Sequence, residues 1–149
     1  MPVELRKARR DEIEVVRDLI VSEQMPAMEL ERWIDDFWLL EDSGVLAGCA
    51  GIENYGEGAV LRSVAVAPAL RGTGWGVRLV NHSLDYARER GALRCYLFTM
   101  TAEGFFPRFG FARCTLEDFE PAVRECWQYR ANVEHEMLRN MLVPMKATL

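Results

Sequence analysis

The sequence predicts an α/β (α+β) fold, in which a mixed and mostly antiparallel sheet of about seven strands carries helices on both faces. Two observations predict it. Strand-like stretches separated by glycine turns lie close together in the first half of the chain, and such hairpins pair antiparallel. A long amphipathic helix then leads to another short strand, which is the order of a parallel crossover. With 149 residues, half of them hydrophobic, the chain is expected to form one domain over residues 1–149.

A strand and a helix are expected at the start of the chain. Val3 and Leu5 precede a run of mixed charge and suggest a short first strand. Asp11 offers an acceptor for the amides of a helix start, and Glu14 follows at the spacing of a capping box. Apolar residues at helical spacing continue from there, so the first helix is predicted to run to about Glu23.

A second amphipathic helix is predicted next, because apolar side chains recur at helical spacing from Leu30 to Trp38. Residues 37–40 are equally compatible with a strand. Strand-like stretches are found at residues 38–40, 45–52 and 59–66. Turns are expected at residues 42–44 and 54–58, where glycines tolerate a positive φ.

The second half of the chain alternates between helices and strands. Residues 71–90 are predicted to form a long helix that ends at Gly91, where a left-handed cap fits. The remaining predicted elements are a strand over residues 93–98, a short helix over 102–109 stopped by Gly110, a strand over 111–116, a helix containing Val133, Met137 and Met141, and a final strand near Met145.

Charge and cysteine usage narrow the classes of partner. A net charge of −5 makes nucleic acid and an anionic membrane unfavourable partners, and no apolar run approaches the roughly 20 residues of a membrane span. The first residues lack a secretory apolar stretch, so we expect a cytoplasmic protein. No Cys-x-x-Cys pair or histidine pair has metal-ligand spacing, so no metal is expected. Reduced, core-packing cysteines are expected at Cys49, Cys95, Cys114 and Cys126.

Residues 61–76, LRSVAVAPALRGTGWG, carry the most informative pattern. A β-branched strand runs into a glycine-rich turn, and a helix start follows, so that several amide groups, a helix dipole and the Arg71 guanidinium converge. These features predict a site for a pyrophosphate. Val77 breaks the dinucleotide fingerprint, and no Gly-Lys-Ser/Thr triplet of a P-loop follows. A turn that only packs tightly is the alternative.

Arg-x-x-Gly-x-Gly after Val-Ala-Val resembles the acyl-coenzyme A site of the GNAT superfamily of N-acetyltransferases. Residues 96–111, YLFTMTAEGFFPRFGF, are similar to the next strand, short helix and Gly-Phe turn of that superfamily. The two motifs together cover residues 59–111. The resemblance implies a GNAT fold whose central strands splay apart to admit the cofactor.

The resemblance also implies acetyl-CoA (coenzyme A) as the cofactor and assigns residues to it. Backbone groups of Val64, Ala65 and Val66 would pair with the pantetheine arm. The pyrophosphate would bind to Arg71, Gly72, Thr73, Gly74, Trp75 and Gly76. Thr99 would face the pantetheine arm, and Phe105 and Phe106 would line the wall near the thioester.

The reaction implied by the resemblance is direct attack of a free amine on the thioester carbonyl in a ternary complex. The amine must first lose a proton, so a base is required. Glu53, expected near the cleft mouth with a partly buried carboxylate, is the candidate, and Glu103 is the second. A solvated carboxylate beside a turn is the alternative for Glu53. Many members of the superfamily have a tyrosine where this chain has Phe106, and water or Thr101 would then protonate the thiolate.

The same segments resemble a narrower set of proteins: small acetyltransferases of arsenic-resistance operons and the acetyltransferase domain of N-acetylglutamate synthases. This resemblance implies a small-molecule amine, such as an α-amino acid, as the acceptor. Arg62 would bind an acceptor carboxylate, and the alternative is an arginine paired on the sheet surface. Residues 119–130 are expected to contribute a lid, and the C-terminal elements are expected to form the seam of a homodimer.

Two other functions compete with a small-molecule N-acetyltransferase. One is a non-catalytic acyl-CoA-binding or regulatory protein, because Phe106 lacks a hydroxyl group. The other is a protein N-acetyltransferase that uses the same fold. The acceptor itself does not follow from the sequence.

Overall fold

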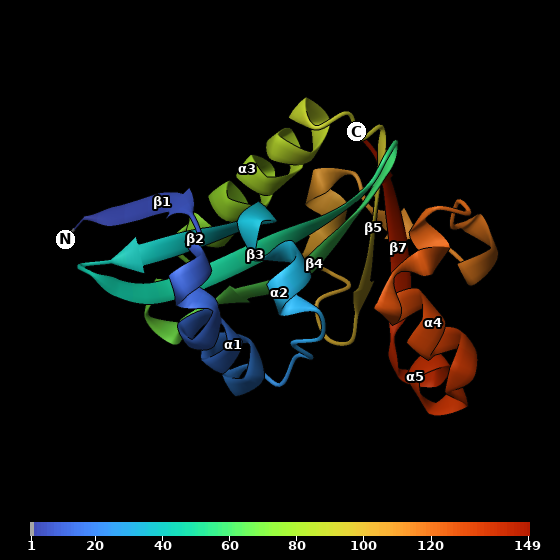
Figure 1. Cartoon of the computed structure of the whole chain (residues 1–149), viewed down its shortest axis with the longest axis horizontal. Helices are drawn as coiled ribbons and strands as arrows, with labels where there is room; N and C mark the ends of the chain where they lie inside the picture. The colour runs from blue at the N-terminus through green and yellow to red at the C-terminus, as the bar shows by residue number, and fades with distance from the viewer. Residues whose placement is uncertain (1) are drawn as a thin grey trace. The chain divides into compact units, whose positions relative to one another are not determined.

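The computed structural model describes residues 2–149, and its strands form a seven-stranded sheet in the order β1-β2-β3-β4-β5-β7-β6 (Figure 1). β4 pairs with β5 in parallel, whereas β1–β2, β2–β3, β5–β7 and β6–β7 are antiparallel. The mixed, mostly antiparallel sheet predicted from the sequence is therefore confirmed. The strands are β1 Val3–Lys7, β2 Phe37–Asp42, β3 Val45–Tyr55, β4 Gly58–Val66, β5 Arg94–Thr99, β6 Ala112–Arg113 and β7 Val143–Thr148. The helices are α1 Ile13–Ser22, α2 Leu30–Trp33, α3 Trp75–Glu89, α4 Trp127–Glu134 and α5 Glu136–Met141.

The chain forms two compact units. The first holds the residues up to Glu53 and Leu61–Tyr86, and the second holds Asn54–Val60 and Ala87–Leu149. Along residues 2–149 the structure contains no helix whose length and apolar character would suit a membrane crossing.

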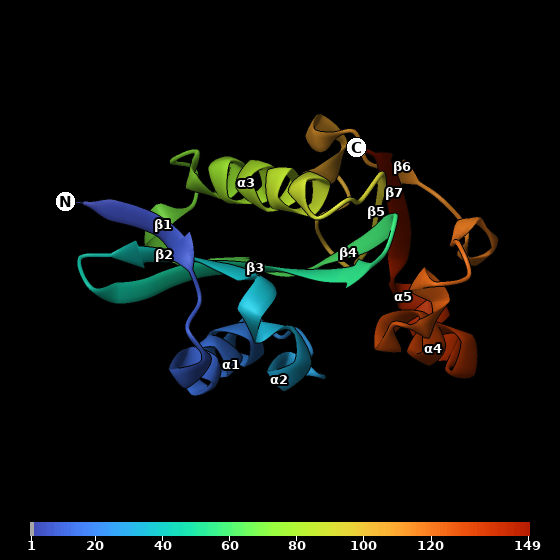
Figure 2. The same cartoon turned by 45° about the horizontal axis from the view of Figure 1, so that its top comes forward.

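In the first unit, α1 and α2 cover one face of β2 and β3, and α3 covers the opposite face (Figure 2). The apolar stripe of each helix supplies the side chains that face the sheet, and burial of these side chains stabilises the layers. Fully buried members of this core are Val16, Ile20, Leu30, Phe37, Leu39, Leu79 and Leu84.

The β2–β3 hairpin shows why its turn contains glycine. Asp42 pairs with Val45, so two residues form the turn, and both have a left-handed φ, +52° at Ser43 and +85° at Gly44. Two consecutive left-handed residues match the twist of a tight hairpin. The predicted turn at residues 42–44 is confirmed.

Two predicted helix boundaries in this unit are wrong. A 3₁₀ turn at Arg10–Glu12 precedes α1, and Glu12 rather than Asp11 caps this turn, because its Oε1 accepts a hydrogen bond from the Arg9 amide at 2.9 Å. α2 ends at Trp33, and Phe37 begins β2, so residues 37–40 form the strand that was the alternative to a longer helix. Pairing with β3 and complete burial of the Phe37 ring outweigh the helical spacing of the sequence.

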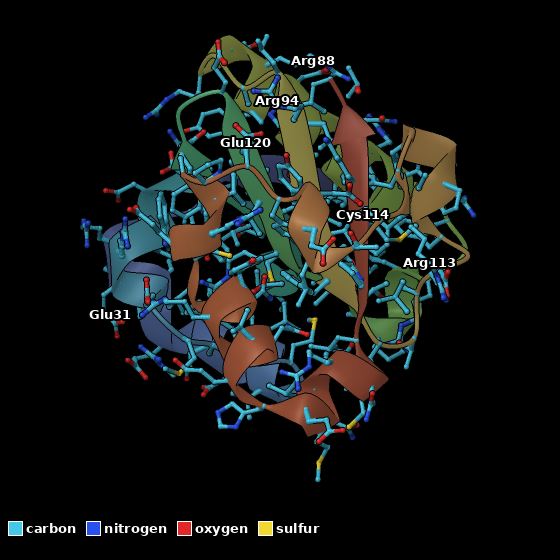
Figure 3. All side chains as sticks on the ribbon, turned by 90° about the vertical axis from the view of Figure 1, so that its right-hand side faces the viewer. Glu31, Arg88, Arg94, Arg113, Cys114 and Glu120 are labelled. Atoms are coloured by element: carbon cyan, nitrogen blue, oxygen red, sulfur yellow. The ribbon has the colours of Figure 1, made fainter. Side chains whose placement is uncertain are left out.

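In the second unit, β5 lies beside the antiparallel β7 (Figure 1). A core cluster covers these strands and consists of Val60, Tyr96, Phe119, Val123 and Cys126. The carboxylate of Glu120 accepts a hydrogen bond from Arg94 Nε at 2.6 Å (Figure 3). It accepts another from the Tyr96 hydroxyl at 2.8 Å. Residues 119–130, which were expected to form a lid, are therefore held in place because Phe119 and Val123 are buried in this core.

The predicted elements of the second unit are shorter or interrupted. The helix expected over residues 102–109 is a 3₁₀ turn at Phe106–Phe109, which ends at Gly110 as predicted, with φ +93°. β6 has only two residues instead of the six expected. The C-terminal helix breaks at His135, which has extended backbone angles, into α4 and α5. β7 confirms the predicted final strand.

Candidate functional site

The glycine-rich turn lies in the first unit, between the end of β4 and the start of α3. Gly72 and Gly74 have φ values of +76° and +89°, which side-chain-bearing residues rarely adopt. Because these two residues are left-handed, they cannot belong to the helix. α3 therefore begins at Trp75 and not at the predicted Arg71. Arg71 and the turn up to Gly74 are exposed. The amides at the start of α3 therefore lie next to an accessible turn, which is the arrangement that binds anions.

Arg71 is held beside this turn by two contacts. Its Nε donates to the Val66 carbonyl at 3.1 Å, and its Nη2 lies 2.6 Å from the Glu23 carboxylate. The Arg71 side chain nevertheless remains 55% exposed. No signal in the sequence predicts the contact with Glu23, because the two residues are 48 positions apart and no local pattern relates them.

The strand that precedes the turn is irregular at Ser63. This residue has a φ of +57° in the middle of β4, a conformation typical of a bulge that redirects the backbone after it. Val64, Ala65 and Val66 follow, with Ala65 buried and the two valines half-buried. Cys49 donates its thiol to the Ser63 carbonyl at 3.1 Å, and burial raises the pKa of this thiol to about 12. Cys49 is therefore a packing residue, as predicted, and not a nucleophile.

Glu53 and Arg62 form a buried ion pair in the first unit. Their side chains are each 1% exposed, and Arg62 Nη1 lies 3.0 Å from Glu53 Oε2. Arg62 also donates to the Met28 carbonyl at 2.6 Å and to the Ser63 hydroxyl at 3.1 Å. Its Nη2 is buried and has no hydrogen-bond partner among residues 2–149. A buried donor without a partner loses its hydration without compensation, so this nitrogen is suited to an incoming acceptor atom.

Three expectations about this pair are wrong. Glu53 does not lie partly solvated at a cleft mouth, because the Arg62 guanidinium supplies the countercharge that allows complete burial. For the same reason the surface alternatives, a solvated Glu53 and an arginine paired on the sheet surface, do not hold. The sequence indicated both residues but not that they contact each other.

The second unit holds the other residues assigned to the cofactor. The buried Thr99 accepts a hydrogen bond from the Ala102 amide at 3.0 Å and so shapes the turn after β5. Phe105 and Phe106 pack edge to face, with ring centroids 5.2 Å apart, and Phe106 also packs edge to face on Phe111. Phe106 is 6% exposed. The two phenylalanines therefore form a packed aromatic pair.

Glu103, the second candidate base, is poorly suited to that role. Both of its carboxylate oxygens accept hydrogen bonds from Arg113 at 2.8 Å, and these bonds hold the pKa of Glu103 below its ordinary range. A carboxylate with a lowered pKa accepts a proton less readily. The part of the chain that the structure describes contains no group of three or more His, Cys, Asp and Glu side chains that could hold a metal ion.

Comparison with known proteins identifies the family of the chain. The amino-acid acetyltransferase of Ralstonia nicotianae is 35% identical over 108 residues, which are 70% of this chain and 24% of that protein. A protein of the same name from Mycobacterium tuberculosis is 28% identical over 120 residues and is covered over 67% of its length. The chain spans about a quarter of the length of the Ralstonia relative.

A solved structure agrees with these relatives. N-acetylglutamate synthase from Neisseria gonorrhoeae, complexed with coenzyme A and N-acetyl-glutamate, matches all of this chain and 35% of its own, with a TM-score of 0.81 and 25% identity. Residues 6–111 match the family model for the acetyltransferase (GNAT) family. Because this match covers more than half of the chain, the chain belongs to the GNAT family of acetyltransferases.

Proposed function

We propose that this chain is an acetyl-CoA-dependent N-acetyltransferase that transfers an acetyl group to the amine of a small, amino-acid-like molecule. The observation that carries the proposal is the exposed turn Arg71–Gly76, in which two left-handed glycines lead from β4 into α3. Relatives named amino-acid acetyltransferase, and a structural neighbour complexed with coenzyme A and N-acetyl-glutamate, support the cofactor and the acceptor class.

The cofactor would be held mainly by the first unit. The turn fits a diphosphate because its amides, the positive end of α3 and the exposed Arg71 guanidinium all favour an anion. Backbone groups of Val64, Ala65 and Val66 would pair with the pantetheine amides. Thr99, Phe105 and Phe106 belong to the second unit, and only the family resemblance assigns them to the cofactor.

Arg62 would bind the acceptor through a carboxylate. Its buried Nη2 donor has no partner in residues 2–149, and a carboxylate oxygen would satisfy it with a charge-assisted hydrogen bond. An α-amino acid brings such a carboxylate next to the reacting amine. An acceptor without this group would leave the Arg62 donor unsatisfied and is expected to bind less well.

In the proposed reaction, the neutral amine attacks the thioester carbonyl directly in a ternary complex. The nitrogen forms the new bond to carbon, the carbon–sulfur bond breaks, coenzyme A leaves as a thiolate, and the second proton that the nitrogen loses on becoming an amide passes to that thiolate. Glu53 would accept the proton that the acceptor ammonium loses. Phe106 offers no hydroxyl group, so water or Thr101 would return a proton to the thiolate, which is a good leaving group.

An acceptor screen tests this function. Purified protein is incubated with acetyl-CoA and a panel of amino acids, and release of free thiol is followed. We expect thiol release that depends on the acceptor, with N-acetylated product found by mass spectrometry. Amines that match the reactive acceptors but lack the carboxylate should react more slowly. Binding of coenzyme A without turnover of any amine would contradict the catalytic part of the proposal.

The second candidate is a non-catalytic acyl-CoA-binding protein, and Phe106 is the observation that favours it. We expect that Phe106→Tyr in such a protein leaves binding of coenzyme A unchanged and produces no turnover. In an enzyme, the added hydroxyl would place a proton donor where the thiolate forms, and kcat would stay measurable or rise.

We also propose a homodimer that uses the C-terminal elements. Met137 and Met141 of α5 are 73% and 45% exposed, although such side chains are usually buried or lie at interfaces. Sedimentation equilibrium is expected to give twice the mass of the chain, and Met137→Lys is expected to shift the population to monomer.

A further inference from the structure

The carboxylate of Glu23 is paired with the guanidinium of Arg71, which is also the proposed ligand of the cofactor's diphosphate. Glu23 is the first residue after α1, and its Oε1 lies 2.6 Å from Arg71 Nη2. We propose that Glu23 is an internal competitor for Arg71, which pairs with this guanidinium when no cofactor is bound and thereby sets the affinity for the diphosphate of coenzyme A. This inference rests on the proposed function, because it takes Arg71 as a diphosphate ligand.

The geometry of Arg71 leaves little room for both anions. Its Nε is already committed to the Val66 carbonyl, so the outer nitrogens of the guanidinium remain for an anion. Glu23 occupies Nη2, so an anion that binds the remaining outer nitrogen, Nη1, lies beside the Glu23 carboxylate. A diphosphate must therefore displace the Glu23 carboxylate or bind beside a like charge. Either event costs binding free energy, because removal of an ion-pair partner and repulsion between like charges both oppose association.

The segment that carries Glu23 is suited to move. It connects α1 to α2, and Gln24 and Glu29 in it have left-handed φ values of +61° and +57° without being glycine. Backbone in this region is strained for residues with a side chain and persists only where other contacts hold it. Two contacts tie this segment to arginine side chains: Glu23 binds Arg71, and the Met28 carbonyl accepts a hydrogen bond from Arg62. When Glu23 leaves Arg71, one of these two contacts is lost.

Calorimetric titration of coenzyme A into wild-type protein and Glu23→Gln tests the proposal. Glutamine keeps the shape of the side chain and removes its charge. We expect Glu23→Gln to bind coenzyme A about three- to tenfold more tightly, as for loss of a surface ion pair together with a like-charge repulsion. The gain should shrink in high salt, which screens exposed charges. Glu23→Ala should bind more tightly as well, which shows that the charge and not the amide is responsible.

Two further proteins serve as controls. Glu31 is an exposed acid that pairs with Arg17 and not with Arg71. Glu31→Gln removes its charge, and the affinity for coenzyme A should not change. In an Arg71→Gln background, Glu23→Gln should give no gain, because the contested guanidinium is absent. Unchanged or weaker binding by Glu23→Gln would overturn the inference and make Glu23 a support for Arg71. If wild-type protein itself does not bind coenzyme A, the proposed function fails instead.

Discussion

Gly51 lies in β3 directly opposite Phe37 of β2 and beneath its ring. A Cβ built on Gly51 would come within 2.3 Å of two ring carbons of Phe37, and this ring is fully buried. The ring has no space to retreat into, because the core is closely packed. The glycine is therefore required by the contact between the two strands and not by its φ.

We predict that Gly51→Ala destabilises the protein by about 1–3 kcal/mol, the usual cost of overpacking a core. The free energy of unfolding from urea denaturation measures this. Gly104→Ala is the matched control, because no atom lies within 4 Å of a Cβ built there, and its free energy should change by less than about 0.5 kcal/mol. Equal stability of the two variants would contradict the contact with Phe37.

Glu53 and Arg62 make a second prediction at the scale of single residues. Glu53→Gln keeps an oxygen for Arg62 Nη1 but cannot accept a proton from the acceptor. We expect kcat to fall about 100-fold or more, with loss of the decline in rate toward low pH that protonation of a general base causes, while the KM for acetyl-CoA changes little. Steady-state kinetics over a range of pH measures both effects.

Glu103→Gln is the control for this experiment. Because Arg113 already binds both oxygens of Glu103, we expect this variant to keep kcat. A Glu53→Gln variant with normal kcat and a raised KM for the acceptor would show that Glu53 positions Arg62 and does not accept the proton.

At the scale of elements, an ion-pair network joins β1, β2 and the start of α1. The guanidinium of Arg6 donates to Glu12 at 2.7 Å and to Glu41 at 2.6 Å. Hydrogen bonds from Arg6 are the main cause that lowers the pKa of Glu12 to about 2 from an ordinary value of about 4.5. Between these two pH values the folded state keeps Glu12 charged while the unfolded chain binds a proton. Stability from this group is therefore present above pH 4.5 and is lost as the pH falls toward 2.

We predict that wild-type protein is more stable than Glu12→Gln by about 1–2 kcal/mol at pH 6, and that the difference narrows by pH 3. Denaturation at a series of pH values measures it. Glu14→Gln is the control, since Glu14 is 80% exposed and lies 3.7 Å from its partner Arg17. A constant gap between wild type and Glu12→Gln over this pH range would show that Glu12 acts through shape and not through charge.

The boundaries of helices and strands were predictable where residues close in the sequence determine them. The hairpin turn at Gly44 and the helix ends at Gly91 and Gly110 follow from glycine alone, and all three have the expected left-handed φ. The end of α2 was not predictable as a single outcome, because the spacing up to Phe37 suits a helix and only pairing with β3 makes it a strand.

The candidate site divides in the same way. The turn at Gly72 and Gly74 was predictable, because a short motif contains the strand, the glycines and the helix start. The contacts of Glu53 with Arg62 and of Glu23 with Arg71 were not, since they join side chains that are brought together only by folding. Local sequence patterns therefore identify which residues carry charge near the site but not which charges already neutralise each other.

At the scale of the whole molecule, a ligand that binds only the folded state must raise its stability. The residues of the first unit that are proposed for acetyl-CoA come from β4 and from the turn before α3, so the unfolded chain cannot reproduce their arrangement. At a free concentration of about 100 times Kd, such binding stabilises the folded state by about 2.7 kcal/mol.

For a chain of this length we therefore predict that saturating acetyl-CoA raises Tm by about 5–10 °C, measured by differential scanning calorimetry. Arg71→Ala at the same ligand concentration should show a smaller rise in Tm, because it loses the cation proposed for the diphosphate. Without ligand, its Tm should lie close to that of the wild type, since the Arg71 side chain is 55% exposed. Coenzyme A should raise Tm nearly as much as acetyl-CoA, because the acetyl group adds little to the binding surface. A Tm that does not respond to millimolar acetyl-CoA would remove the cofactor from the proposed function, and with it the role assigned to the glycine-rich turn.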